Sequence, residues 1–112
     1  MFNEAFSHGK KFKFNSDNLP FTTLDEYVKT SMDSFVVREV FINPKAKFGA
    51  RPAVVSDKFK MNLPKHFVKD IEKILATPEM IEAINNGKCG FVPEQYEKDG
   101  KTYNSGKFFD IT

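Results

Sequence analysis

The chain has 112 residues, a formal net charge of +2, 13 Phe, no Trp and a single cysteine, Cys89. A chain of this length can bury one core without disulfides or metals, and one cysteine excludes an internal disulfide. The weak global charge means that an anionic partner has to be met by a local basic patch.

The sequence also bears on location. Nowhere do about 18 apolar residues follow one another, as a membrane helix requires. The amino-terminal sequence MFNEAFSHGKKF lacks a basic segment followed by an apolar one, which a secretory signal would have. We therefore expect a cytoplasmic protein with no membrane partner.

Residues 1–34 carry the weakest patterns. Residues 10–14 (KKFKF) alternate Lys with Phe, the period of a short strand. This strand is either an extra edge strand or the first strand of a different α+β sheet. Residues 15–20 are typical of a turn, and residues 23–28 of a short helical turn or an irregular connection.

Strand signals dominate the middle of the chain. Residues 35–42 (FVVREVFI) are rich in β-branched and aromatic side chains and predict a long strand, with imperfect alternation that indicates a bulge. Residues 52–56 and 59–61 predict two short strands, which form one bent strand or a tight hairpin around Asp57 and Lys58. The loop INPKAKFGAR separates the long strand from these pieces.

The period then changes to that of a helix. One apolar face has the spacing i, i+1, i+4, i+7 and i+8, which predicts an amphipathic helix; its residues are Phe67, Val68, Ile71, Ile74 and Leu75. Thr77 and Pro78 predict the start of a second short helix, which NNG at 85–87 ends. Residues 89–96 and 102–111 predict a hairpin around the Asp99-Gly100 turn.

The order of these elements predicts a fold of the mainly β class with α elements. Residues 1–112 form one domain in this interpretation, an OB-fold-like five-stranded barrel with a helix between strands 3 and 4. In such a barrel the loops at residues 43–51 and 97–101 flank the same ligand face.

Four segments carry a resemblance to a known family: FVVREVFINPKAKFGARPAVVS, NLPKHFVKDIEKIL, INNGKCGF and YEKDGKTYNSGKFFDI. Over residues 35–112 the chain resembles small OB-fold single-stranded-DNA-binding proteins of phages and conjugative elements of Gram-positive bacteria. The resemblance implies binding of single-stranded DNA with little sequence preference during replication or recombination of a phage or mobile element, without catalysis. Housekeeping members of this class recruit replication enzymes through an acidic tail, whereas this chain ends in FFDIT, so we do not expect recruitment of that kind.

The distribution of cations points to the same activity. Between Arg38 and Lys60 six cations stand against Glu39 and Asp57 only, a local excess of four. Cations that follow phosphates and rings on which bases stack are what single-stranded nucleic acid requires. The candidate binding residues are Arg38, Lys45, Lys47, Phe48, Arg51, Lys58 and Lys60 around the first loop, with Tyr96, Lys98, Lys101 and Tyr103 on the hairpin.

Simpler interpretations exist for each part. The loop is also typical of a solvated hairpin whose lysines keep a sheet edge soluble. Tyr96 and Tyr103 are also explained as a cross-strand packing pair. Phe108 and Phe109 are adjacent in a strand and must point in opposite directions, so one of them is exposed or covered by a partner.

Two other classes of protein remain open. A Cys89–His66 dyad is conceivable for an enzyme, but Cys89 beside Gly90 is more typical of a small buried residue, and no catalytic motif occurs. We therefore expect no catalytic residue, no metal and no cofactor. A protein-interaction module is the other class. Either the acidic and apolar second helix or the last strand could pair with a replication or recombination protein, or with a second copy in a homodimer.

Overall fold

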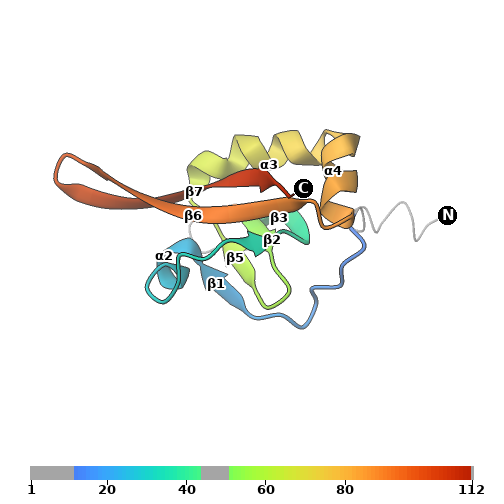
Figure 1. Cartoon of the computed structure of the whole chain (residues 1–112), viewed down its shortest axis with the longest axis horizontal. Coiled ribbons are helices and arrows are strands. Elements are labelled where there is room, and N and C mark those ends of the chain that lie inside the picture. Colours follow the sequence, from blue (N-terminus) through green and yellow to red (C-terminus); the bar gives the residue numbers. More distant parts are fainter. Residues whose placement is uncertain (1–11, 44–50, 112) are drawn as a thin grey trace.

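A computed structural model of the chain describes residues 12–43 and 51–111. The amino-terminal half contains five short strands and one helix: β1 Phe21–Thr23, α2 Leu24–Tyr27, β2 Phe35–Val36, β3 Glu39–Asn43, β4 Arg51–Val55 and β5 Lys60–Asn62. The remainder contains the helices and a long hairpin: the 3₁₀ helix η2 Lys65–Phe67, α3 Val68–Leu75, α4 Pro78–Asn85, β6 Cys89–Lys98 and β7 Lys101–Asp110 (Figure 1).

The strands form two sheets. One has the order β1-β5-β4-β3 and the other β2-β6-β7. Neighbouring strands are antiparallel except β1 and β5, which are parallel. The described part of the chain is therefore mainly β, as the sequence predicts. The helices α3 and α4 lie between β5 and β6, so the predicted helix between strands 3 and 4 is not confirmed.

The predicted strand at residues 35–42 is divided between the two sheets. The Val37 N–H donates to the carbonyl of Cys89 at 2.8 Å, whereas the Arg38 N–H donates to the carbonyl of Val55 at 2.7 Å. Two successive residues thus hydrogen-bond to different sheets, and the chain passes from one sheet to the other here. The imperfect alternation of FVVREVFI marks this crossing.

Within the described residues the strands do not close into a barrel, so the five-stranded barrel is not confirmed. The two sheets are joined where β2 leads into β3, and a closed barrel would also need β1 to pair with β7. A side-chain contact spans this gap, because Asn104 Nδ2 on β7 donates to Asp25 Oδ1 on α2 at 2.7 Å.

The core lies between the two sheets and α3. The predicted apolar face of the helix is confirmed, since Phe67, Ile71 and Ile74 are buried. Phe91 from β6 is fully buried, and its ring centroid lies 5.8 Å from that of Phe67. Phe108 packs on the same ring at 5.2 Å, while its neighbour Phe109 is 36% exposed, which confirms that the two side chains point in opposite directions.

Local signals at the turns are confirmed. Asp99 and Gly100 have φ of 55° and 79°, the two positive values that a tight type I′ hairpin turn requires. Gly87 ends α4 with a φ of 71°. The α2 turn is capped by Thr23, whose Oγ1 accepts a hydrogen bond from the Glu26 N–H at 3.1 Å.

The prediction of a strand at residues 10–14 is wrong for residues 12–14, the part that the structure describes. Phe12, Lys13 and Phe14 belong to no strand, and residues 10 and 11 lie outside the described residues. Phe12 is buried in the core, and the Lys13 N–H donates to Asn85 Oδ1 at 2.8 Å. A side chain of α4 therefore takes the hydrogen bond that a neighbouring strand would have taken.

None of the described helices is long and apolar enough to cross a membrane.

The hairpin depends on a close approach at Gly106. A Cβ atom there would lie 2.4 Å from Cζ of Phe91 and 2.7 Å from the carbonyl oxygen of Val92. We expect Gly106→Ala to lower the free energy of unfolding by roughly 1–3 kcal/mol in urea denaturation, because a fully packed ring would have to move. Thr102→Val, at an exposed position of the same strand, should stay within about 0.5 kcal/mol of wild type; equal stability of both variants would contradict this account.

Candidate nucleic-acid interface

The hairpin β6–β7 projects from the body of the molecule (Figure 1), and residues 94–103 are exposed throughout. Tyr96 and Tyr103 stand directly opposite each other in the ladder, and their rings stack with centroids 5.5 Å apart and planes at 23°. They are 48% and 40% exposed. Lys98 and Lys101 form the next-but-one pair, at the tip of the hairpin. The structure therefore brings these four predicted residues together.

A second group of rings and polar side chains lies on the four-stranded sheet. In a sheet, residues that are paired across neighbouring strands point to the same side, and successive residues along a strand alternate between the two sides. The register therefore shows which residues point to the side that faces away from α3. We call this side the outer face. The register places on it Phe21, Thr23, Glu39, Phe41, Asn43, Arg51, Ala53, Val55, Lys60 and Asn62. Lys60 was predicted as a site residue from the sequence, and its ammonium lies 4.7 Å from the ring centroid of Phe21.

The two phenylalanines of the outer face come from opposite edges of the sheet. With β5 and β4 between them, β1 and β3 are roughly 14 Å apart at about 4.8 Å per strand. The ring centroids of Phe21 and Phe41 are nevertheless only 6.4 Å apart. The rings therefore lean toward each other across the sheet, over the fully buried side chains of Ala53 and Val55. Phe21 remains 52% exposed and offers a ring surface to solvent.

The first predicted loop is described only at its ends. Lys45, Lys47 and Phe48 lie outside the described residues. Arg51 begins β4 opposite Asn43, and its Nε donates to the carbonyl of Leu63 at 3.1 Å. This bond holds the guanidinium against the segment that leads into η2.

Arg38 and Lys58 lie at the other end of β4. The Nε atom of Arg38 donates to Asp57 Oδ1 at 2.6 Å, in an ion pair whose two side chains are 33% and 58% exposed. Lys58 follows Asp57 in the turn between β4 and β5. The carboxylate offsets the charge of Arg38, so the local excess of cations predicted from the sequence is smaller here.

The described members of the predicted site are thus divided among separate surfaces. The Asn104 side chain points to α2, so its neighbour Tyr103 points to the opposite side of the hairpin. Ser105 is on the tyrosine side, where His66 Nε2 of η2 lies 3.3 Å from its Oγ. The tyrosine pair therefore points away from α2, and the outer face of the other sheet turns away from α3.

Sequence reasoning missed Phe21 and the two asparagines as site residues. Asn43 Nδ2 donates to Asn62 Oδ1 at 3.3 Å, which links β3 to β5 across the outer face. Phe21 joins this face only because β1 pairs in parallel with β5, a pairing between segments far apart in the sequence. The alternation in residues 39–43 was a usable signal for Phe41 and Asn43, since they share one side of a strand.

The residues considered for catalysis are arranged differently from a dyad. Burial, reinforced by the negative charge of Asp110, raises the pKa of the Cys89 thiol from 9.0 to about 11. The hydrogen bond of His66 goes to Ser105. Among the described residues, no group of three or more His, Cys, Asp or Glu side chains could hold a metal ion.

The chain matches no known family model, no curated protein and no solved structure.

The raised pKa of Cys89 predicts slow alkylation. At pH 8 the folded protein should react with iodoacetamide roughly 10- to 100-fold more slowly than free cysteine, because a thiol whose pKa is raised holds less thiolate at that pH. The rate should rise as the pH approaches about 11, as long as circular dichroism shows a folded protein. Protein unfolded in urea provides the control, and a folded rate equal to that of free cysteine would contradict the burial of this thiol.

Proposed function

We propose that this protein binds single-stranded DNA with little sequence preference. The observation that carries the proposal is the exposure of three aromatic rings, Phe21, Tyr96 and Tyr103, each on a surface that also holds lysines. Rings of this kind provide stacking surfaces for bases, and lysines beside them bind the phosphates that connect those bases.

The outer face supplies the parts of such a site. Lys60 covers one side of the Phe21 ring in the free protein, and its flexible stem allows the ammonium to move to a phosphate when a base arrives. Phe41 supports the ring from the side at 6.4 Å. The amides of Asn43 and Asn62 lie on the same face and can exchange their mutual hydrogen bond for bonds to a base edge. Because every base has a π face, a site of this composition favours no particular sequence.

The hairpin contributes through its rings more than through its charge. Six charged residues lie between positions 94 and 107, and they cancel in sign: Glu94, Glu97 and Asp99 against Lys98, Lys101 and Lys107. The stacked tyrosines hold each other in place, which lowers the entropy cost of fixing either ring under a base. We assign Tyr96 and Tyr103 to stacking, and Lys98 and Lys101 to phosphates near the tip.

We also infer that the chain is an opened variant of the OB fold. Support comes from the order of its elements, with antiparallel β3-β4-β5, then α3, then the hairpin β6–β7, and from the strand that passes between both sheets at Val37 and Arg38. In this proposal the protein acts in the cytoplasm during replication or recombination of a phage or mobile element, as the sequence resemblance implies. Recruitment of replication or recombination proteins belongs to the same proposal.

The first test is fluorescence anisotropy with a labelled oligo-dT of about 30 nucleotides. We expect Phe21→Leu to raise Kd roughly 5- to 100-fold, because it keeps an apolar side chain and removes the stacking surface of one ring. Tyr96→Leu should raise Kd by a similar factor if the strand reaches the hairpin.

Met32→Ala is the matched control, since Met32 is also exposed (41%) but has no ring. Wild-type affinity in both the Phe21 and Tyr96 variants would overturn the proposal for the described surfaces. Tighter binding to duplex DNA or to oligo-U would overturn the assignment of single-stranded DNA as the ligand.

Lys60 should carry part of the salt dependence of binding. We expect Lys60→Ala to lower the slope of log affinity against log salt by about 0.7, the value for one phosphate contact on a single strand. Lys60→Arg should restore the slope, and Lys69→Ala, at an exposed position of α3, should leave it unchanged. An unchanged slope for Lys60→Ala would remove Lys60 from the interface.

A further inference from the structure

The strand β7 has a free edge whose backbone groups point outward. The Ile111 N–H donates to the carbonyl of Lys88 at 2.8 Å, so this pair faces inward, between the two strands. In an antiparallel ladder the next pair, Asp110 and Cys89, must face outward. The carbonyl of Cys89 indeed faces away from β7, because it accepts a hydrogen bond from the Val37 N–H next to β2.

The same alternation continues along β7. Phe108 and Gly106 follow Asp110 at steps of two, and their backbone groups point to the free edge as well. Pro93, which has no N–H to donate, stands opposite Gly106, as expected for an outward-facing pair. Beyond Gly106 the edge meets η2, where His66 contacts Ser105. The accessible edge therefore runs from Gly106 to Asp110.

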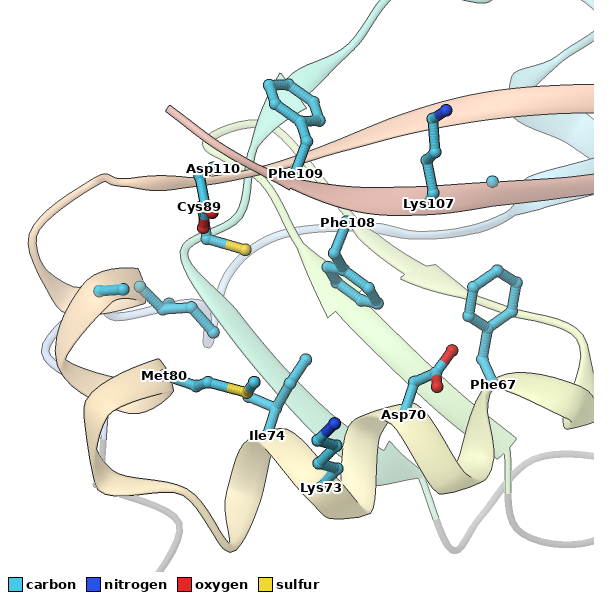
Figure 2. Close-up of a pocket in the computed structure, with 13 residues that line it drawn as sticks. Phe67, Asp70, Lys73, Ile74, Met80, Cys89, Lys107, Phe108, Phe109 and Asp110 are labelled. Carbon is cyan, nitrogen blue, oxygen red and sulfur yellow. The ribbon is translucent and has the colours of Figure 1, made fainter. Parts of the chain in front are cut away.

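A cavity of about 420 Å³ lies beside this edge, between β7 and the helices α3 and α4 (Figure 2). Phe108 points into it, and Ile74 and Met80 line it from the helices. Met80 and Phe109 are 37% and 36% exposed, so apolar surface remains uncovered on both sides of the strand edge.

The charged groups at this cavity have complementary signs. Four charged side chains line the cavity: Asp70 and Lys73 from α3, and Lys107 and Asp110 from β7 (Figure 2). Lys107 pairs with Glu94 at 3.7 Å. The three ion pairs found among the described residues involve neither Lys73 nor Asp110. Among the described residues, one chain thus offers the base Lys73 and the acid Asp110 outside any ion pair beside this strand edge, with the acid Asp70 one turn before Lys73 on α3.

We propose that the occupant of this edge is a second copy of the chain, which pairs its own β7 antiparallel to the first around a two-fold axis at Phe109. In this register Phe108 of one copy stands opposite Asp110 of the other, and both residues have outward-facing backbone groups. The two pairs related by the axis form four backbone hydrogen bonds. Phe109 faces Phe109 of the other copy at the axis in a non-hydrogen-bonded pair. In each chain the Phe109 ring lies over Gly90 of β6, 2.4 Å from where a Cβ atom would stand.

The register also explains why a second copy fits better than an unrelated peptide. Asp110 lies on the same side of its strand as Phe108, the side that faces α3. Placed opposite Phe108 of the first copy, Asp110 of the second copy reaches the cavity that Phe108 and Lys73 line, and we assign Lys73 as its partner. The two-fold axis repeats this contact, so two acids meet two bases.

This pairing does not depend on DNA binding. The outer face and the stacked tyrosines lie outside the edge from Gly106 to Asp110, so failure of either proposal leaves the other to be judged separately.

Sedimentation velocity of the full chain without nucleic acid tests the proposal. We expect a concentration-dependent dimer, with Lys73→Glu and Asp110→Lys each raising its dissociation constant by roughly tenfold or more through like charges across the interface. The double variant Lys73→Glu/Asp110→Lys restores the opposite-sign contact and should recover most of the loss. Lys69→Glu on the same helix is the charge-matched control and should leave the dissociation constant unchanged.

A backbone variant tests strand pairing itself. Asp110→Pro removes an N–H that points to the free edge and leaves the bonds between β6 and β7 in place, so the monomer should stay folded by circular dichroism. We expect it to weaken the dimer more than Asp110→Ala, which keeps the N–H. A wild-type chain that stays monomeric at about 1 mM overturns the proposal. So does a dimer that responds to none of these variants.

Discussion

The structure depends on one stretch of backbone that serves both sheets. At Val37 the N–H bonds to β6, and at Arg38 the next N–H bonds to β4. Because the same chain segment is an edge of each sheet, the sheets must bend around a common interior, and Val37 itself is fully buried at the crossing. The ring of Phe35 secures one side of this crossing at 5.7 Å from Phe91. A substitution that disturbed the crossing would therefore separate the two halves of the core.

The elements predicted correctly from the sequence are those set by local physics. The helix at Phe67 to Leu75 follows from a repeated apolar spacing, and the hairpin turn from Asp99 and Gly100, whose positive φ values few other residues adopt at low cost. By contrast, β1 has three residues, and its pairing partner β5 lies far along the chain. The sequence FTT has no local pattern that predicts such a strand, because β1 forms its strand hydrogen bonds with the distant parallel strand β5.

The same distinction applies to the candidate site. The hairpin turn fixes the register of β6 and β7, so Tyr96 and Tyr103 could be predicted as a facing pair from the sequence alone. The ion pair between Arg38 and Asp57 could not be predicted from the sequence, because the two side chains meet only when β3 and β4 are paired. Phe21 is the extreme case, since its place beside Lys60 depends on β1, an element that the sequence does not reveal.

The two proposals use opposite properties of an open sheet. Stacking of bases needs a face whose rings are fixed from below, and the outer face provides this because Ala53 and Val55 are buried beneath its rings. Strand pairing needs an edge whose backbone is free, and β7 provides this over Gly106 to Asp110. Since the edge and the face do not overlap, a dimer joined at β7 keeps both outer faces open. Two linked faces bind one long strand more tightly than separate chains do, because the second contact forms at a high effective concentration. Self-pairing at β7 would therefore strengthen DNA binding without adding a single contact to DNA.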